Sequence, residues 1–470
     1  MEKTQVAVIG GGPGGYAAAF RAADLGLSVT LIDSEVNPGG VCLYRGCIPS
    51  KALLHAAKLI NETKDAANWG LYFGEPRIKI AELRDWKNKV VKQLTGGLGM
   101  LVKQRKITYV QGFATFKDSN TVIVKTANDE EKEISFEHAI LATGSSPTKV
   151  PSLWIDSTRL MDSTGALELR DIPQSLLVIG GGYIGLEMGS VYAALGTRVT
   201  VVEMTDGLLP GADRDLVAVL QKRIEKQFHS VLLKTKVLSL TEQRDSVKVL
   251  LENENGEKNE ELFSRVVMCV GRKPNSANLG LENTGVKINA KGFVEVDIQR
   301  RTAESSIFAI GDVAGEPMLA HKANHEGIVA AEVIAGHKVA YEPACIPAVV
   351  FTDPEIAWAG ITEKEAKAQN LDVQIAKFPW AASGRAVTLD RTDGLTKLIV
   401  DKSTERILGV GIVGAGAGEM IAEAAMAIEM AALAIDMQLT IHPHPTLSET
   451  LMETAEQIYG SSTHLYRPKR

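Results

Sequence analysis

The chain has 470 residues, of which 45% are apolar and 23% charged, and its 51 basic and 57 acidic side chains give a net charge of −6. This length predicts about three or four domains with substantial cores, and the composition excludes disorder, collagen and a coiled coil. The acidic balance excludes a basic surface that would concentrate nucleic acid or anionic lipid, so we expect small partners, no nucleic acid and no membrane.

The first element predicted along the chain is an apolar strand over residues 5–9. Because it begins almost at once, it leaves no room for a basic, apolar leader, and we expect a cytoplasmic protein. The longest apolar stretch, residues 420–435, is shorter than the ~20 residues that cross a bilayer and carries Glu423 and Glu429. It is therefore predicted to be a packed helix.

A glycine-rich turn follows the first strand. It contains Gly10, Gly12 and Gly15, a helix continues to about residue 25, and a strand over residues 28–32 ends at Asp33. One glycine permits the tight turn, one lets the backbone approach a pyrophosphate, and one packs helix against strand, while a carboxylate accepts a hydrogen bond from a ribose hydroxyl. The segment therefore predicts a dinucleotide site.

The same unit occurs a second time. A strand over residues 176–179 leads to Gly180, Gly182 and Gly185, a helix runs to about residue 195, and the next strand ends at Glu203. In both copies the acid lies 23 residues after the first glycine. The repetition predicts an α/β fold with two Rossmann-like domains and two dinucleotide sites, and the acid at position 203 favours NAD over NADP.

Local composition predicts the remaining elements. They are a helix over 80–104, strands over 107–125 broken at 118–120, a buried strand over 139–144, a meander over 231–270 with its hairpin tip at 252–261, and elements over 360–370 and 419–434 in a mixed C-terminal segment. A third glycine cluster, at 414–418, lacks the third glycine and a following strand that ends in an acid, so we interpret it as a loop entering a helix.

Two cysteines, Cys42 and Cys47, lie five positions apart in a chain with only four. A regular helix would separate them by roughly 8–9 Å, whereas a disulfide needs Cα atoms within about 7 Å. If the pair closes, the helix must be distorted, and Gly46 and Pro49 are the expected places. A strained, reducible disulfide suits catalysis, so redox chemistry is favoured over metal binding or inert thiols.

The other two cysteines, Cys269 and Cys345, each lie alone in apolar or mixed segments, and we expect them to be packed and inert. The cysteine spacing does not match a metal site, and no second Cys or His pair lies nearby, so no metal is expected.

Over essentially its whole length the chain resembles the flavoprotein disulfide reductases, also called pyridine nucleotide-disulfide reductases. The resemblance rests on both glycine-rich units, the Cys42–Lys51 segment, Ala142-Thr143-Gly144, Glu187, Gly271-Arg272-Lys273-Pro274-Asn275, Ile307 to Asp312, and His442 to Glu449. It implies an FAD-binding domain at 1–150, an NAD-binding domain at 151–275, a segment at 276–345 that returns to the FAD domain, and a C-terminal α+β dimerisation domain at 346–470.

The resemblance also implies roles for individual residues. The catalytic set would be Cys42, Cys47, Lys51, Glu187, His444 and Glu449. FAD would contact Gly10, Gly12, Gly15, Asp33, Lys51, Ala114, Thr143, Gly144, Asp312 and Ala320, and NAD would contact Gly180, Gly182, Gly185, Glu203, Val237 and Gly271. Tyr183 would either cover the nicotinamide pocket, as in some relatives, or be a plain helix-face aromatic.

Within this family, the chain is most similar to the members that oxidise protein-bound dihydrolipoyl groups and reduce NAD⁺ to NADH in 2-oxo acid dehydrogenase complexes. The resemblance implies that Cys42, the more accessible thiol, exchanges with the lipoyl dithiol, while Cys47 passes electrons to FAD. The partner would be a lipoyl-carrying acyltransferase or carrier protein. Val41, Tyr44 and Arg45 depart from the usual residues around the cysteines, and altered packing is the expected effect.

A base is needed to deprotonate a thiol at neutral pH, and His444 with Glu449 fits that need. On residues alone a satisfied loop histidine is the preferred interpretation of His444, and Thr446 with Glu449 also matches a capping box. His442 is interpreted as structural. The resemblance implies a homodimer in which His444 serves the other subunit's disulfide, and an ion pair between Lys51 and Glu187 beside the flavin.

Two alternative functions are compatible with these features. One is another NAD(P)H-dependent flavoprotein disulfide reductase, of the glutathione or mercuric type, although Glu203 and the absence of a C-terminal cysteine pair argue against it. The other is a non-catalytic flavin-bound docking subunit, which the intact cysteine and histidine motifs argue against.

Overall fold

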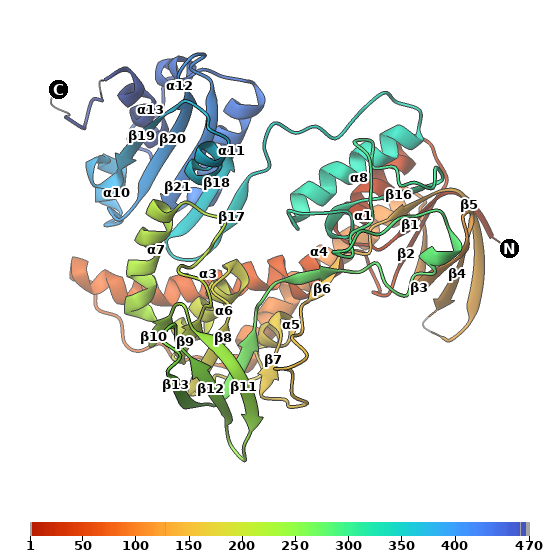
Figure 1. The fold of residues 1–470 in the computed structure, drawn as a ribbon, viewed down its shortest axis with the longest axis horizontal. Helices are drawn as coiled ribbons and strands as arrows, with labels where there is room; N and C mark the ends of the chain where they lie inside the picture. Colours follow the sequence, from red (N-terminus) through yellow and green to blue (C-terminus); the bar gives the residue numbers. More distant parts are fainter. Residues whose placement is uncertain (1, 127, 461, 467–470) are drawn as a thin grey trace.

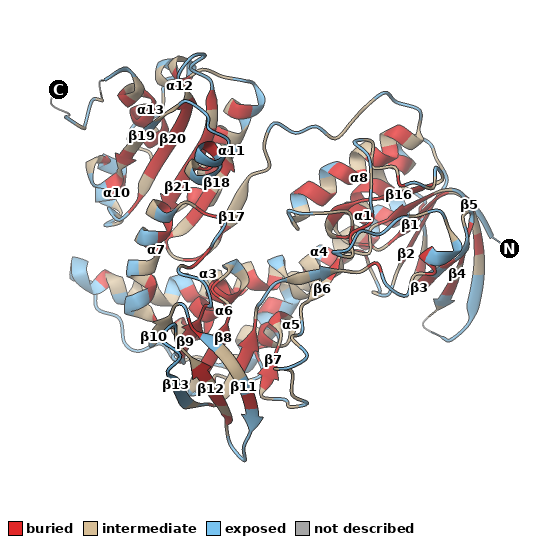
Figure 2. Ribbon diagram, in the orientation of Figure 1, coloured by how far each residue is buried: buried red, intermediate tan, exposed pale blue. Residues whose placement is uncertain are grey.

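A computed structural model describes residues 2–126, 128–460 and 462–466, and this part of the chain forms three lobes, each built on its own sheet (Figure 1). The predicted mixed α/β fold class is confirmed. In every lobe buried residues are concentrated in the central strands, and the helices expose their outer faces, as Figure 2 shows. None of the helices in the described part of the chain is long and apolar enough to cross a membrane.

The first lobe contains a six-stranded sheet. Its strands are β1 (Glu2–Ile9), β2 (Val29–Asp33), β3 (Thr108–Asp118), β4 (Thr121–Thr126), β5 (Glu131–Leu141) and β16 (Ile307–Ala309). The strand β1 pairs in parallel with both β2 and β5, and β16 pairs in parallel with β5, so the chain returns to this sheet after leaving it for more than a hundred residues. The helices α1 (Pro13–Asp24) and α8 (Ala320–Ile334) pack against each other.

Three helices connect β2 to β3. They are α2 (Gly40–Arg45), α3 (Cys47–Asp65) and α4 (Ile80–Gln104), with a short 3-10 turn at Ala66–Trp69. The predicted helix over 80–104 and the strand break at 118–120 are confirmed. The helix α3 extends toward the second lobe and contacts its glycine-rich helix, so the cysteine segment joins the first two lobes.

The second lobe contains a parallel sheet with the order β10-β9-β8-β14-β7. These strands are β7 (Leu160–Met161), β8 (Ser175–Ile179), β9 (Arg198–Val202), β10 (Ser230–Leu232) and β14 (Arg265–Met268), and the helices are α5 (Ser163–Leu167), α6 (Tyr183–Ala194) and α7 (Arg214–Gln227). An antiparallel sheet of β11 (Lys236–Glu242), β12 (Val247–Glu252) and β13 (Lys258–Phe263) covers one side.

The predicted meander over 231–270 is correct only in its centre. Its end strands, β10 and β14, belong to the parallel sheet instead. In β14, Val266, Val267 and Met268 are all buried. Continuous burial is typical of a strand covered on both faces, whereas a strand of an exposed hairpin would alternate. A short antiparallel pair, β6 (Ser145–Pro147) with β15 (Arg272–Pro274), links the first and second lobes.

The third lobe contains an antiparallel sheet with the order β17-β18-β21-β20-β19. The strands are β17 (Ala348–Val350), β18 (Glu355–Gly360), β19 (Val373–Pro379), β20 (Leu395–Asp401) and β21 (Ile407–Gly414). The helices are α9 (Glu363–Ala368), α10 (Gly384–Thr388), α11 (Ala417–Glu429), α12 (Ala434–Leu439) and α13 (Glu449–Glu456). Short 3-10 turns lie at Leu281–Asn283, Gly311–Val313, Trp380–Ala382 and Gln457–Tyr459.

The prediction of one packed helix over 420–435 is wrong, because α11 ends at Glu429 and α12 begins at Ala434. Ala431 has a positive φ of 52°, and the backbone around it bonds to the neighbouring strand instead of continuing the helix. The N–H of Ile407 donates to the carbonyl of Ala432, for example. The glycine cluster at 414–418 is, as expected, a loop that enters α11.

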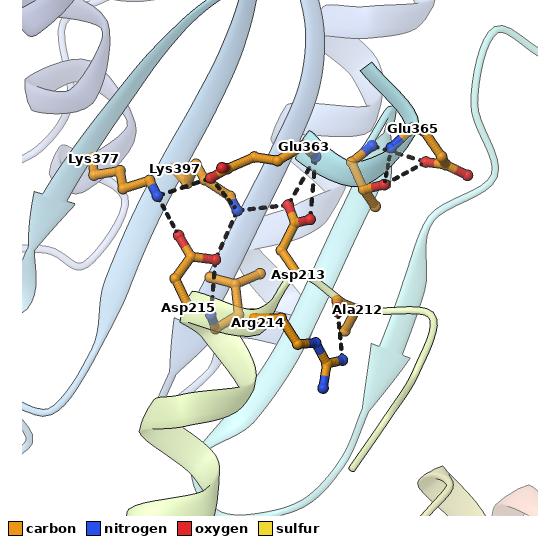
Figure 3. Close-up of polar contacts among 10 residues, drawn as sticks. Ala212, Asp213, Arg214, Asp215, Glu363, Glu365, Lys377 and Lys397 are labelled. Carbon is orange, nitrogen blue, oxygen red and sulfur yellow. Dashed lines mark hydrogen bonds and ion pairs between the residues drawn. The ribbon is translucent and has the colours of Figure 1, made fainter. Parts of the chain in front are cut away.

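A cluster of charges around the buried Lys397 joins the second and third lobes (Figure 3). Lys397, on β20, is 0% exposed, and its Nζ lies 2.6 Å from Asp213, 2.8 Å from Asp215 and 2.9 Å from Glu363. Lys377 bonds Asp215 and Glu363 as well. The two aspartates stand at the start of α7, so this cluster fixes the N-terminus of that helix to the third sheet.

Candidate active site

A cavity of about 970 Å³ lies between the first two lobes. Among the residues predicted for FAD and catalysis, its lining includes Gly10, Gly12, Asp33, Cys42, Cys47, Lys51, Ala114, Thr143, Gly144, Glu187, Asp312 and Ala320. These positions come from parts of the sequence that are up to 310 residues apart, so the fold brings the motifs together. A cavity of this size is large enough for a dinucleotide.

The first glycine-rich turn closes one end of this cavity. Gly10 has a φ of +104°, and a side chain there would place its Cβ 2.3 Å from the carbonyl oxygen of Ala142. A Cβ at Gly15 would lie 1.8 Å from the Gly10 carbonyl oxygen, so α1 packs against β1 only because both positions are glycine. The N-terminus of α1, which no side chain caps, borders the cavity at Gly12 and Gly14, and such a helix start fits a pyrophosphate.

Asp33 lies at the end of β2, beside this turn. Its carboxylate accepts hydrogen bonds from the N–H of Gly11 at 2.5 Å and of Glu35 at 2.8 Å. Burial raises the pKa of Asp33, and the bond from Gly11 opposes that rise. The carboxylate is thus held in place at the edge of the cavity, where a ribose hydroxyl would approach.

The second glycine-rich turn repeats this geometry. Gly180 has a φ of +108°, a Cβ at Gly185 would lie 2.2 Å from the Gly180 carbonyl oxygen, and Glu203 accepts hydrogen bonds from Gly181 and Thr205, each at 2.8 Å. These residues, with Gly182, Val237 and Gly271, do not line the large cavity. Tyr183, at the first position of α6, does line it, and burial raises its pKa to about 12.

The cysteine pair lies where two helices meet. The helix α2 ends at Arg45, Gly46 has φ −144° and ψ −118°, and α3 begins at Cys47. The predicted distortion is confirmed at Gly46, where a Cβ would lie 2.8 Å from the Val41 carbonyl oxygen. It is wrong at Pro49, which lies in the first turn of α3, where a missing N–H breaks no helical hydrogen bond.

Both cysteines are free thiols in this structure, and they interact directly. A hydrogen bond between them raises the pKa of Cys42, and burial adds to this rise. The same bond, opposed by burial and assisted by the Lys51 ammonium, lowers the pKa of Cys47 to about 7. Cys47 therefore carries the thiolate of the pair near neutral pH.

In the chain by itself, Cys47 is exposed and Cys42 only partly so, because Cys47 borders the large cavity. That Cys42 is the cysteine open to a lipoyl group stays a prediction. Cys47 stands at the start of α3 and faces the cavity. That the two sulfurs form a redox-active disulfide in the oxidised protein stays a prediction.

The predicted ion pair between Lys51 and Glu187 is present, with Nζ 2.8 Å and 3.1 Å from the carboxylate oxygens. Two residues that the sequence did not point out complete it. Ser50 donates to Glu187 at 2.9 Å, and the N–H of Phe351 donates to it at 3.1 Å. Ser50 adjoins the motif and could have been found there, whereas no sequence signal connects Phe351 to this site.

Asp312 is positioned by a chain of polar contacts. Ser145 donates to it at 2.5 Å, and Arg272 donates to the Ser145 hydroxyl at 2.7 Å. Beneath this turn, Glu326 is 0% exposed and accepts hydrogen bonds from the N–H of Gly311 at 2.6 Å and from Arg300 at 2.9 Å. No motif of the sequence pointed to this buried carboxylate, which lies on α8.

His444 lies in the third lobe, ahead of α13. Its Nδ1 lies 2.8 Å from Glu449, and the other oxygen of that carboxylate accepts from the N–H of Thr446 at 2.7 Å. Burial raises the pKa of Glu449, but these two contacts outweigh it, so the net shift is downward. The predicted capping box is only half present. Glu449 accepts from the Thr446 N–H, but the Thr446 hydroxyl donates to the Pro443 carbonyl, and α13 begins at Glu449 with Ser448 as its N-cap.

The other histidine of this segment, His442, bonds Glu423 at 2.7 Å and the carbonyl of Thr440, in agreement with a structural role. His444 does not line the cavity that holds the cysteines in the described part of the chain. Together with Gly384 and His464, it lines a separate small pocket in the third lobe.

The carboxylates of Asp213, Asp215 and Glu363 lie close enough to hold a cation. The Lys397 and Lys377 ammonium groups lie among them, however, so the cluster is satisfied by the chain's own charges (Figure 3).

The fold and the cavity define a class of protein that couples a dithiol to two dinucleotide-binding units, and comparison with known proteins agrees. Residues 4–327 match the pyridine nucleotide-disulphide oxidoreductase family, and residues 346–455 match the dimerisation domain of the same family. The chain therefore belongs to the pyridine nucleotide-disulphide oxidoreductases, and it carries their dimerisation domain.

Its similar relatives include the dihydrolipoyl dehydrogenases of Vibrio parahaemolyticus, 49% identical over 99% of this chain and 98% of the relative, and of Haemophilus influenzae, 49% identical over 99% and 97%. Among solved structures, LpdA from Mycobacterium tuberculosis matches with a TM-score of 0.89 and 27% identity, over 97% of this chain and 99% of that one. The flavoprotein disulfide reductase RclA from Escherichia coli matches with a TM-score of 0.87 and 28% identity, over 97% and 100%.

Proposed function

We propose that the protein is a dihydrolipoyl dehydrogenase, an oxidoreductase that converts protein-bound dihydrolipoamide to lipoamide and reduces NAD⁺ to NADH. The observation that carries this proposal is the cavity in which Cys42 and Cys47 adjoin the first glycine-rich turn, in a chain 49% identical to enzymes of that name. The glutathione-type, mercuric-type and docking-subunit alternatives are not favoured, because these relatives match over nearly the full length of the chain.

The enzyme uses FAD and NAD. The lining of the cavity fits FAD: the α1 N-terminus would hold the pyrophosphate, Asp33 the ribose, and Asp312 and Lys51 the ribityl chain and flavin. The second turn, with Gly180 and Glu203, would hold NAD. When bound, FAD supplies a two-electron carrier between the dithiol and NAD⁺. The proposal includes the division of the chain into an FAD-binding domain at 1–150, an NAD-binding domain at 151–275, a segment at 276–345 that returns to the FAD domain, and a dimerisation domain at 346–470.

The chain's own residues manage the thiols. Cys42 would exchange with the lipoyl dithiol, and Cys47, whose thiolate is favoured near pH 7, would face the flavin. Attack by one lipoyl sulfur on Cys42 forms a mixed disulfide, breaks the Cys42–Cys47 bond and releases Cys47 as a thiolate. The second lipoyl sulfur then attacks the first, which closes the lipoyl ring and releases Cys42 as a thiol. His444 would accept the proton of the attacking thiol at Nε2, because Glu449 holds its Nδ1.

His444 reaches a cysteine pair only if a second subunit supplies one, since it lies outside the cysteine cavity of its own chain. We therefore propose a homodimer in which each active site is shared. The partner in the reaction would be a lipoyl-carrying acyltransferase or carrier protein of a 2-oxo acid dehydrogenase complex. We place the enzyme in the cytoplasm, where thiols outside the redox pair, such as those of Cys269 and Cys345, persist in reduced form.

Steady-state kinetics of the FAD-loaded protein test the proposal. NAD⁺ reduction by dihydrolipoamide should be rapid, and reduction of glutathione disulfide by NADH or NADPH should be at least a hundredfold slower. A higher rate with glutathione disulfide would overturn the assignment, and no turnover with either substrate would favour the docking subunit.

A further inference from the structure

The carboxylate of Glu187 collects contacts from two parts of the fold. It is almost fully buried, and it accepts from Ser50 and Lys51 on α3 and from the N–H of Phe351 in the third lobe. Phe351 also contacts the other member of the ion pair, because Lys51 Nζ lies 4.4 Å from the centroid of its ring. One residue of the third lobe thus contacts both charges.

Phe351 is itself held firmly. It follows the edge strand β17, which pairs with β18 in the third sheet. Two residues later, Asp353 lies 2.7 Å from Arg391 of the third lobe and 3.7 Å from Arg223 on α7 of the second lobe. The segment that carries Phe351 is therefore fixed to two lobes and presents its ring to α3.

The position of Lys51 matters for Cys47, because a cation near a thiol favours the thiolate. Lysine has a long, flexible side chain, and 30% of the Lys51 side chain is exposed, so its ammonium needs partners to stay in one place. An aromatic face attracts a cation, and the Lys51 ammonium lies over the Phe351 ring as well as beside Glu187.

We propose that Phe351 is a positioning residue for the redox centre, whose ring and backbone N–H together hold Lys51 and Glu187 so that the ammonium stays beside Cys47. This inference rests on the proposed function. According to this inference, the third lobe influences the dithiol of its own chain through Phe351, in addition to supplying His444 to a second subunit.

The test is a pH titration of the thiolate in the two-electron-reduced, FAD-loaded enzyme, followed by the long-wavelength absorbance of a thiolate against flavin. The titratable groups of the same chain that interact electrostatically with Cys47 include Tyr16, Cys42, Lys51, Tyr183 and Glu187, and His444 of a second subunit would join them in the proposed dimer. Phe351→Leu keeps the backbone N–H and removes the ring face, so the apparent pKa of Cys47 should rise by about half a unit. Phe351→Tyr keeps the ring and should match the wild type.

A second comparison shows whether Phe351 acts through Lys51. In a Lys51→Met background, Phe351→Leu should cause no further shift. An unchanged titration in Phe351→Leu, or the same shift with and without Lys51, would overturn the inference, and if Phe351→Leu does not fold, Phe351→Met is judged by the same criteria. If the wild type shows no thiolate absorbance at all, it is the proposed function that fails.

Discussion

Nδ1 of His444 lies 2.8 Å from Oε1 of Glu449, and this contact leaves Nε2 as the ring nitrogen that can take a proton. The Thr446 N–H fixes the second carboxylate oxygen, so the carboxylate cannot rotate away. Because the pKa of Glu449 is lowered on balance, the group is ionised at neutral pH. The pair is built to orient an imidazole.

Replacement of this pair should therefore affect the thiol step. We expect His444→Gln to lower the rate of dihydrolipoamide oxidation by about 10²–10⁴-fold, because that is the usual contribution of a general base. Glu449→Gln should lower the rate by a smaller factor, because the carboxylate only orients the histidine. Steady-state NAD⁺ reduction measures both. The matched control is His442→Gln, on the same segment but bonded to Glu423, and it should stay within about twofold of the wild type. Equal losses in all three variants would remove the special role of His444.

Sharing of the active site between subunits can be tested by complementation. Cys42→Ser and His444→Gln enzymes should each be nearly inactive as homodimers. A mixed dimer of the two has one site with an intact cysteine pair and an intact histidine, if these come from different chains. Random exchange of subunits should then restore about a quarter of wild-type activity, because half the dimers are mixed and one of their two sites works. No recovery in verified mixed dimers would contradict the shared site.

The thiol pair predicts a second pH effect. The hydrogen bond from Cys42 is the largest cause that lowers the pKa of Cys47, so its loss must raise that pKa. We expect the thiolate absorbance of a Cys42→Ala enzyme to titrate at a higher pH than that of Cys42→Ser, whose hydroxyl still donates a hydrogen bond. Cys47→Ser should have no such absorbance while it retains FAD. Full lipoamide turnover in Cys42→Ser or Cys47→Ser would refute the redox assignment.

The charge cluster around Lys397 in Figure 3 should contribute to stability. Lys397→Met leaves the carboxylates of Asp213, Asp215 and Glu363 with only Lys377 to neutralise them, and we expect a loss of about 3–5 kcal/mol in the free energy of unfolding. Urea denaturation measures this loss. The control is Lys402→Met, which removes an exposed ion pair with Asp372 and should change the free energy of unfolding by less than about 1 kcal/mol.

The sign of the pH dependence follows from the same contacts. Burial raises the pKa of Asp215, but Lys377 and Lys397 outweigh it and lower the pKa overall. In the wild type, the stability from Asp215 is therefore present above its unfolded pKa and is lost as pH falls through the folded pKa. In Lys397→Met the carboxylates repel one another, so the deficit should shrink as acid protonates them. A deficit that does not depend on pH would mean that lost packing, not charge, is the cause.

The sequence alone determined the parts whose physics is local. A glycine-rich turn between strand and helix needs glycine at Gly10 and Gly15 because a Cβ would meet backbone there, so the motif is visible without a structure. The same holds for the strand that ends in an acid and for the break at Gly46. Local patterns failed at helix ends, as in the supposed single helix over 420–435, where bonds from a neighbouring strand decided the backbone.

Only the tertiary structure decided which distant residues meet. Phe351 reaches the Lys51–Glu187 pair from more than 160 positions away, and Glu326 supports the turn at Gly311 from a buried position on α8, so neither has a periodicity or spacing that marks it. The position of His444 outside the cysteine cavity of its own chain is likewise a property of the packed lobes. Motifs record what a backbone turn requires of its own residues, whereas contacts between lobes depend on how whole sheets pack.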